Sequence, residues 1–440
     1  MRFGTDGVRG RAHTELTTSF VTRLGRAAAE VLGTSTWIIG RDTRESGADF
    51  ERALAEGLTG AGATVRSAGV LPTPALARAG VVHRVPTAMI TASHNPFEDN
   101  GVKLFAAGGL KLDDATQAAI EARMDALVAP GSSESPSAGD TDAEARFADE
   151  YIGWLVSLFP AGCLQGLDIV LDCANGAMSE VAPIVAERLG ASVELINASP
   201  DGRNINAECG ATSPGDLAAA VLVRGADLGL AFDGDGDRVI AVDQHGETID
   251  GDRLLALAAL QLRDAEALAG DTVVVTVMSN LGLRHAMARA GMHLVETVVG
   301  DRAVLEALDS GGFSLGGEQS GHIIYRDLAT TGDGLLAGMR LAQHVAESGR
   351  SLGELAGEVM TSYPQVLVNV RVAERHPSIA DELAAEIAAA EATFDGDGRI
   401  LVRASGTEPL IRVMVEAPTT DQAAETAESL AAVVRARFAG

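Results

Sequence analysis

The sequence predicts an α/β fold: three tandem α/β domains with mixed sheets, then a smaller C-terminal α+β domain, around a central cleft. Three segments share one pattern, in which a β-branched run is followed by polar turn residues, an Ala/Leu-rich helical pattern and a second strand. Alternating strands and helices are typical of α/β domains, and three copies in tandem indicate a repeated domain. After Tyr363-Pro364 the pattern changes to strands and helices typical of an α+β domain with an antiparallel sheet.

The predicted elements follow this order along the chain. The first strands of the three units are Trp37–Arg41, Asp168–Gly176 and Thr272–Asn280, and the second strands are Thr87–Ala92, Asp227–Phe232 and Gly312–Leu315. The last domain is predicted to contain strands Gln365–Val372, Arg399–Val402 and Ile411–Glu416, and helices Ser378–Ala392 and Thr420–Phe438. A Ser/Pro/Gly/Asp-rich stretch, Pro130–Ala143, is typical of a solvated linker. We therefore expect domains at residues 1–148, 149–247, 248–363 and 364–440.

Each second strand runs into a polar, Gly-rich loop. These loops are Ser93-His-Asn-Pro96, Asp233-Gly-Asp-Gly-Asp-Arg238 and Gly317-Glu-Gln-Ser-Gly-His322. Ligands in open α/β sheets bind beyond the carboxyl ends of the strands. The sequence therefore predicts that the three domains contribute one loop each to a shared cleft.

Composition narrows the class of protein. The net charge of −27, from 61 acidic and 34 basic residues, argues against a broad nucleic-acid-binding surface. The N-terminus lacks the apolar region of a signal peptide, and apolar runs such as Leu254–Leu262 are too short to span a membrane. Three scattered cysteines predict neither a disulfide framework nor a Cys-based metal site. We expect a cytoplasmic protein without nucleic-acid or membrane partners.

The loop after the second domain's strand predicts a metal site. Asp233, Asp235 and Asp237 alternate with glycines, so three hard oxygen ligands lie close together on a backbone that can fold around an ion. An EF-hand is excluded because Arg238 and Gln244 stand where that motif needs Gly and Glu. The alternative is an ordinary Asp/Gly turn, which we favour for the two-carboxylate stretch Asp395-Gly-Asp-Gly398. Three carboxylates repel one another unless a cation screens them, which favours a divalent metal.

Mg²⁺ usually completes its coordination with phosphate oxygens and water. Ser93 could supply these oxygens if it is phosphorylated, and would then be a fourth metal ligand. By itself the Asn-Pro sequence after Ser93 is typical of a simple turn. The segment lacks the Gly-x-Ser-x-Gly elbow of a Ser-His-Asp hydrolase.

The other loops offer polar groups suited to a sugar phosphate. Arg403, Ser405, Gly406, Thr407 and Arg412 form a plausible anion-binding nest, or alternatively a hairpin turn flanked by solvated arginines. Glu318 and Ser320 suit adjacent sugar hydroxyls. Lys103 and His322 are candidate acid–base residues, although a surface lysine and a structural histidine are the alternatives. No Gly-x-x-x-x-Gly-Lys-Ser/Thr motif occurs, which excludes a P-loop kinase.

Together these motifs resemble, over essentially the full length, the α-D-phosphohexomutase superfamily and within it the bacterial phosphoglucosamine mutases. The supporting stretches, in the family's order, are Phe3–Gly10, Gly40–Arg44, Thr91–Gly101, Asp233–Arg238, Gly317–His322 and Arg403–Pro409. The chain departs from the family's usual pattern at Ala404, Ser213 and Ala303, where proline, Thr-His-Pro and an aromatic residue are common. None of these departures removes a proposed reacting group.

The resemblance implies a TATA-box-binding-protein-like C-terminal domain, a phosphoserine at Ser93, and one Mg²⁺ on Asp233, Asp235 and Asp237. It implies sugar contacts at Glu318 and Ser320, phosphate contacts at residues 403–412, and a mutase that interconverts glucosamine 6-phosphate and glucosamine 1-phosphate through a 1,6-bisphosphate, which also serves as activator. Arg9 would offset charge on the transferring group. A phosphoglucomutase or phosphomannomutase, and a non-catalytic sugar-phosphate binder, stay open as alternatives, and a homodimer is possible.

Overall fold

The computed structural model describes residues 2–4, 7–127, 143–405 and 409–438. It consists of two compact units, one formed by Met1–Met278 with Met292–Gly357 and the other by Ser279–Gly291 with Glu358–Gly440. Most of the predicted linker Pro130–Ala143 lies outside the described residues. Within the described chain, no helix is long and apolar enough to cross a membrane.

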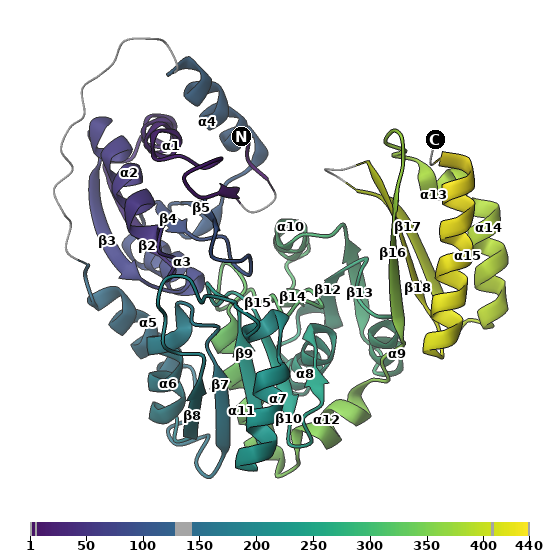
Figure 1. Ribbon diagram of the computed structural model, residues 1–440. Helices are drawn as coiled ribbons and strands as arrows, with labels where there is room; N and C mark the ends of the chain where they lie inside the picture. Colours follow the sequence, from purple (N-terminus) through teal and green to yellow (C-terminus); the bar gives the residue numbers. More distant parts are fainter. Residues whose placement is uncertain (1, 5–6, 128–142, 406–408, 439–440) are drawn as a thin grey trace. The chain divides into compact units, whose positions relative to one another are not determined.

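The first α/β domain is built on a sheet in the order β1-β5-β4-β2-β3, with β6 paired to β5 (Figure 1). β4 and β3 run parallel to β2, whereas β5 runs antiparallel to β4. The strands are β1 (Val8–Arg11), β2 (Thr36–Arg41), β3 (Thr64–Val70), β4 (Thr87–Ile90), β5 (Asp99–Ala106) and β6 (Leu110–Lys111). The helices are α1 (Thr18–Leu32), α2 (Gly47–Gly60), α3 (Thr73–His83) and α4 (Asp114–Ala126).

The second domain has a sheet in the order β11-β10-β9-β7-β8, and the third has the order β13-β12-β14-β15. The second domain comprises α5 (Arg146–Ser157), β7 (Asp168–Asp172), α6 (Met178–Arg188), β8 (Ser192–Ile196), η1 (Gly210–Thr212), α7 (Gly215–Arg224), β9 (Leu228–Phe232), β10 (Val239–Asp243) and β11 (Thr248–Ile249). The third comprises α8 (Gly251–Asp264), η2 (Ala269–Asp271), β12 (Thr272–Thr276), β13 (His293–Thr297), α10 (Asp301–Gly311), β14 (Leu315–Gly317), β15 (Ile323–Tyr325), α11 (Gly334–Ser348) and α12 (Leu352–Val359).

The three sheets repeat one strand order. Each has a central strand (β2, β7 or β12) flanked by two parallel strands, and beyond the second of these an antiparallel strand (β5, β10 or β15). This repetition confirms the predicted tandem α/β domains with mixed sheets. The prediction named two strands in each of the three units and missed the others, which include the interior antiparallel strands β5 and β10 as well as the sheet-edge strands β3, β8 and β13. β8 and β13 have no buried residue. Their half-exposed side chains lack the continuous apolar run of a central strand.

The loops that were expected to carry chemistry follow the most deeply buried strands. Every residue of β4, β9 and β14, the strands that precede these loops, is buried. Such fully buried strands, covered on both faces, are typical of the interior of α/β sheets. The polar side chains of residues 93 and 233–237 are thus held at the ends of rigid elements.

The C-terminal unit is an α+β domain with an antiparallel sheet in the order β16-β18-β17, as predicted. α14 and α15 lie on one face of this sheet, over a core that includes Ile411, Val413 and Leu430 (Figure 1). The elements are α9 (Leu281–Arg289), β16 (Gln365–Arg371), α13 (Ile379–Glu382), α14 (Ala384–Glu391), η3 (Ala392–Phe394), β17 (Arg399–Ala404), β18 (Leu410–Glu416) and α15 (Thr420–Phe438). The expected single helix Ser378–Ala392 is interrupted at Leu383, whose φ and ψ are −112° and 13°.

Candidate active site

Ser93 lies just beyond β4 and is 1% exposed. Its backbone has the left-handed φ of 53°, which is unfavourable for a residue with a side chain and is found preferentially at functional sites. Its N–H donates to Thr91 Oγ1 at 2.8 Å, and its hydroxyl donates to Asp233 Oδ2 at 2.6 Å. The loop therefore aims the serine hydroxyl at the carboxylate cluster of the second domain.

His94 is adjacent to the serine, but its ring is a weak partner for it. Nδ1 lies 3.4 Å from Ser93 Oγ. Burial, together with the positive charges of Arg238 and Arg9, lowers the pKa of His94 to about 4. The ring is thus neutral at physiological pH, and the residue shapes the loop rather than supplying a charge.

A buried arginine, Arg44, holds the loop in place by binding its backbone. Its guanidinium donates to the carbonyl oxygens of Ser93 at 2.9 Å, Asn95 at 2.8 Å and Asp99 at 2.9 Å, and also to that of Pro96. Its charge is balanced by Asp42, whose Oδ2 accepts from Nε at 2.9 Å. These charge-assisted hydrogen bonds fix both sides of the turn.

Asn206 adds a second anchor from the neighbouring domain. Its Nδ2 donates to the carbonyl oxygens of Ser93 at 2.9 Å and Asn95 at 3.1 Å. Sequence reasoning assigned no role to Arg44 or Asn206. The resemblance of Gly40–Arg44 to the family's pattern is the signal that could have indicated Arg44.

Asp233, Asp235 and Asp237 form one buried cluster. They are 1%, 0% and 3% exposed, and each offers a ligand atom within 4.8 Å of the others. Oδ1 of Asp235 and Oδ1 of Asp237 are buried and accept no hydrogen bond from a described residue. Buried carboxylate oxygens without donors are destabilising unless a cation binds them. The residues present therefore fit an oxygen-ligated divalent ion.

The electrostatics of the cluster agree with this fit. Burial and the charges of Asp237 and Asp235 raise the pKa of Asp233 to about 8. Burial also opposes ionisation of Asp237, but Lys103 and His322 hold its pKa well below the usual value. Without a metal, the site thus favours a bound proton on one carboxyl and charge on another, as expected for like charges held close together.

Lys103 projects into the same cluster from β5. It is 3% exposed, and its Nζ lies 2.8 Å from Asp235 Oδ2 and 2.9 Å from Asp237 Oδ2. Thr73, at the start of α3, donates to the same Asp235 oxygen at 2.6 Å. The alternative that Lys103 is a solvated surface residue is therefore wrong.

His322 also lies beside the carboxylate cluster and is 2% exposed. Its Nδ1 is 3.5 Å from Asp237 Oδ1, and its Nε2 accepts from the Gly332 N–H at 3.1 Å. Burial lowers the pKa of His322, but Asp237 and Asp301 outweigh burial and raise it. Both ring nitrogens thus face protein groups around the metal loop.

An open cavity of about 430 Å³ adjoins this cluster. Arg9 and Arg238 bring positive charge to its wall, and Glu318 brings an acceptor whose Oε1 is also 3.2 Å from the Gly300 N–H. The volume lies within the range of small-molecule sites, roughly 300–1,000 Å³. Ser320 is not part of this wall, and its buried hydroxyl has no hydrogen-bond partner in the described part of the chain.

The predicted phosphate-binding residues belong to the C-terminal unit. Arg403 and Arg412 are directly opposite each other on β17 and β18, and burial followed by the charge of Arg412 lowers the pKa of Arg403. Like charges in opposed positions are unfavourable, so this pair suits an anion. Ser405 is buried, and its N–H donates to the Leu410 carbonyl oxygen at 2.8 Å. Gly406 and Thr407 lie outside the described residues.

Comparison with protein families gives matches over nearly the whole chain. Four models described as phosphoglucomutase/phosphomannomutase match in order: alpha/beta/alpha domain I at residues 1–129, domain II at 149–246, domain III at 250–363 and the C-terminal domain at 367–433. The predicted boundaries at 148, 247 and 363 stay predictions.

Individual relatives agree with this result. The chain is 49% identical to a phosphoglucosamine mutase of Rhodococcus opacus (strain B4), covering 98% of each chain, and 50% identical to one of Thermobifida fusca (strain YX), again over 98% of each. Among solved structures, a phosphoglucomutase/phosphomannomutase family protein of Burkholderia thailandensis is similar, with a TM-score of 0.81, 26% identity and coverage of 99% of this chain and 97% of that one.

Proposed function

Because the chain belongs to the phosphoglucomutase/phosphomannomutase family, we propose that it is a phosphoglucosamine mutase, an isomerase that interconverts glucosamine 6-phosphate and glucosamine 1-phosphate. Full-length relatives bearing that name at about half identity support the amino-sugar substrate. The observation that carries the mechanism is the 2.6 Å contact from Ser93 Oγ to the buried carboxylate cluster, beside a cavity lined by Arg9 and Arg238.

Ser93 acts as the carrier of a phosphoryl group. The Oγ–P bond of phosphorylated Ser93 breaks as the free sugar hydroxyl bonds to phosphorus and loses its proton, which gives a hexosamine 1,6-bisphosphate. This intermediate turns over and returns its other phosphoryl group to Ser93, so the net reaction is an isomerisation. Most of the catalysis in such transfers comes from positioning and from stabilising charge on the phosphoryl oxygens.

Asp233, Asp235, Asp237 and phosphorylated Ser93 would hold one Mg²⁺, which offsets charge on the phosphoryl group when bound. Arg9 adds positive charge from the cavity wall. Lys103 and His322 are the proposed proton carriers, because both are buried at the carboxylate cluster. Arg44 and Asn206 keep the serine loop in its strained conformation.

The remaining predicted residues bind substrate in this proposal. Glu318 and Ser320 accept and donate hydrogen bonds to sugar hydroxyls, and the C-terminal loop binds the phosphate that does not react. The residues proposed for that phosphate are Arg403, Ser405, Gly406, Thr407 and Arg412. A hexose bisphosphate as activator, a cytoplasmic location and a homodimer stay predictions.

The serine mechanism is tested with Ser93→Ala, assayed for mutase turnover with the bisphosphate activator present. Loss of the phosphoryl carrier is expected to lower kcat by at least about 10³-fold, as removal of a nucleophile does in other enzymes. Ser314→Ala is the control, because Ser314 is also buried but has no role in the proposed site. Full turnover by Ser93→Ala would exclude the mechanism and favour a non-catalytic binder or another reaction.

A second candidate is a phosphoglucomutase or phosphomannomutase, since the matching family models bear those names. The 2-substituent is the difference between the substrates. We expect kcat/KM to be highest for glucosamine 6-phosphate when it is compared with glucose 6-phosphate and mannose 6-phosphate at saturating activator. Equal values for all three would contradict the glucosamine assignment while leaving the Ser93 mechanism intact.

A further inference from the structure

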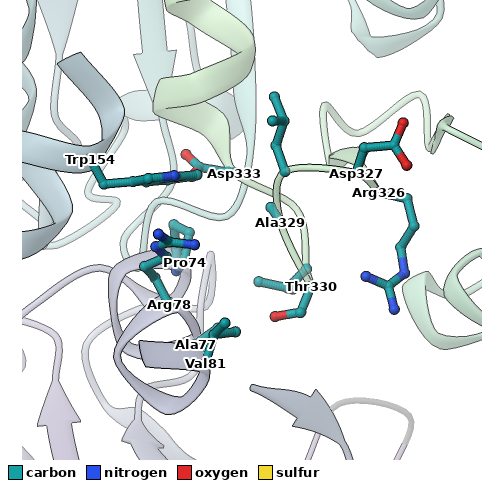
Figure 2. A pocket seen from close by; sticks show the side chains of 12 residues that line it. Pro74, Ala77, Arg78, Val81, Trp154, Arg326, Asp327, Ala329, Thr330 and Asp333 are labelled. Atoms are coloured by element: carbon teal, nitrogen blue, oxygen red, sulfur yellow. The ribbon is translucent and has the colours of Figure 1, made fainter. Parts of the chain in front are cut away.

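A second cavity, of about 200 Å³, shares no lining residue with the cavity beside the carboxylate cluster. Its walls are α3 of the first domain, Trp154 of α5, and the segment 326–333 between β15 and α11 (Figure 2). The volume is below the roughly 300–1,000 Å³ of drug-sized sites, so an occupant would be a small metabolite. None of these residues takes part in the proposed mutase mechanism.

Arg78 brings to this cavity a positive charge that has no ion-pair partner among the described residues. Its guanidinium carbon lies 4.4 Å from the centre of the Trp154 ring, and Figure 2 shows the two side chains stacked at one side of the cavity. Its Nε is buried without a hydrogen-bond partner, and no carboxylate among the described residues forms an ion pair with it. Burial lowers the pKa of Arg78, although a guanidinium keeps its charge in proteins. A half-buried cation of this kind is stabilised by an anion.

The other charged groups of the cavity have partners or lie away from it. The Asp333 carboxylate accepts from the Tyr151 hydroxyl at 2.8 and 2.9 Å and from the Leu336 N–H at 2.9 Å. Arg326 pairs with Asp309 at 2.5 Å. The exposed Asp327 carboxylate points away from the space between Arg78 and Thr330 in Figure 2. Arg78 is therefore the cationic group that this part of the described chain leaves for a ligand.

We propose that this cavity is a second ligand site, which binds a small oxyanion, a carboxylate or a phosphate, on Arg78. The guanidinium offers its N–H edges to two oxygens, the geometry in which arginine binds both kinds of group. Thr330 lies across the cavity from Arg78 with its hydroxyl available as a further donor (Figure 2). Pro74, Ala77 and Ala329 provide an apolar wall for the remainder of the ligand.

The position of the cavity couples it to the active site. Pro74 of the wall follows Thr73, whose hydroxyl and N–H bind the Oδ2 and the carbonyl oxygen of Asp235 at 2.6 and 2.9 Å. In the opposite wall, Gly332 lies between the lining residues Thr331 and Asp333, and its N–H donates to His322 Nε2. A ligand between these walls contacts both elements that hold the metal loop, so its binding alters kcat. This coupling rests on the proposed function, whereas the binding itself does not.

Tryptophan emission offers a direct test of binding. The chain has two tryptophans, and Trp37 is fully buried in the core of the first domain, so Trp154 is the one that reports on this cavity. The full-length protein is titrated separately with inorganic phosphate and with benzoate. We expect a saturable change in emission with at least one probe, and the responding probe distinguishes a phosphate from a carboxylate ligand. Trp154→Phe should abolish the change.

Arg78→Met should weaken this binding at least tenfold. The matched control is Arg340→Met, because Arg340 also stacks on an aromatic ring, 4.8 Å from the centre of Phe159, but does not line the cavity. Unfolding midpoints equal to wild type establish that both variants fold, and Arg78→Lys, which keeps the charge, should retain part of the affinity. No saturable change with either probe, or equal affinity in Arg78→Met, would overturn the site.

The coupling is tested by mutase turnover at saturating substrate, where competition at the active-site cavity vanishes. The probe that binds should change kcat at least twofold in wild type and in Arg340→Met, and should leave Arg78→Met unaffected. An unchanged kcat in wild type at saturating probe would overturn the coupling. A failure of the coupling differs from a failure of the mutase assignment. If the protein is not a mutase, wild type shows no turnover even without a probe, whereas if only the coupling is wrong, wild type turns over normally and the probe does not change kcat.

Discussion

Two loops of this chain have almost the same sequence and opposite surroundings. Asp233-Gly-Asp-Gly-Asp237 is buried, whereas Asp395-Gly-Asp-Gly398 has both aspartates exposed. The first loop follows the fully buried strand β9 and receives donors from three other segments, at Ser93, Thr73 and Lys103. The second connects η3 to β17 and has left-handed φ values of 50° and 91° at its first two residues.

An Asp/Gly sequence specifies a tight turn, but it does not specify whether that turn binds a metal. Glycine alternating with aspartate makes a tight turn in both places. Burial and partners from distant segments then turn one of the loops into a candidate metal site. In the other loop the Asp397 carboxylate accepts a hydrogen bond from the Tyr363 hydroxyl at 3.0 Å, which is a structural contact within the C-terminal unit.

The largest expected difference between the loops is in activity. Asp235→Asn removes a charged ligand atom from the buried cluster, so Mg²⁺-dependent kcat should fall by at least about 10²-fold, equivalent to the several kcal/mol that a catalytic metal supplies. Asp397→Asn should change kcat by less than about twofold. Steady-state turnover of both variants, with Mg²⁺ varied, makes the comparison. Similar losses in the two variants would show that the loops do not differ in the way proposed.

Metal affinity should depend on pH for the first loop. Burial and the neighbouring aspartates raise the pKa of Asp233 to about 8, so at pH 7 the metal-free site holds a proton that Mg²⁺ must displace. The dissociation constant should therefore fall by up to about tenfold per pH unit below pH 8 and level off above it. Calorimetric titration of unphosphorylated protein at pH 6.5, 7.5 and 8.5 measures this slope. The Asp397→Asn variant should keep this pH dependence of Mg²⁺ affinity, and the Asp233→Asn variant should lose it. A dissociation constant that does not change with pH in wild type would contradict the proposed displacement of a proton by Mg²⁺.

The sequence predicted the parallel strands at the centre of each of the three units but not the strands around them, which include β10, although every residue of β10 is buried. Continuous apolar runs identified β2, β7 and β12 and the strands that carry the site, because a strand buried on both faces needs apolar residues throughout. β8 and β13 were missed since edge strands, with one exposed side, do not require such a run. The break at Leu383 was missed because no glycine or proline marks it.

The candidate site was predicted where chemistry depends on a local motif and missed where it depends on the fold. Ser93 and the three aspartates lie in short polar loops that a sequence pattern can identify. Arg44 and Asn206 donate hydrogen bonds to the backbone carbonyl oxygen of Ser93, 49 and 113 residues away in the sequence. Because every residue has a carbonyl oxygen, the sequence does not indicate which one such a side chain will bind. The pairing of Lys103 with Asp235, across 132 residues, likewise depends on how two domains pack.

The glycines of the two loops should respond differently to substitution. A Cβ at Gly234 would lie 2.7 Å from the Ser93 carbonyl oxygen and 2.8 Å from Asn206 Nδ2, so Gly234→Ala should displace the serine loop and lower kcat several-fold, up to about tenfold. A Cβ at Gly396 would meet no atom within 4 Å, but its φ of 91° disfavours alanine. Gly396→Ala should therefore destabilise the protein by about 1 kcal/mol and leave kcat unchanged. Turnover and denaturant midpoints of both variants check this pair; a loss of activity in Gly396→Ala would contradict it.

The smallest expected effect is at the contact that occupies the second loop. Tyr363→Phe removes the hydroxyl that donates a hydrogen bond to Asp397. Because Asp397 is exposed, the free energy of unfolding should fall by only about 0.5–1 kcal/mol. Asp397→Asn, which weakens the same bond, should not add to this loss when the two changes are combined. Denaturant unfolding of the full chain for the two single variants and the double variant gives the coupling. Full additivity would mean that the loss in Tyr363→Phe comes from the other contact of its hydroxyl, to His285 Nδ1 at 3.3 Å, and not from Asp397. A fall in kcat in either variant would give the second loop a functional role that its exposure argues against.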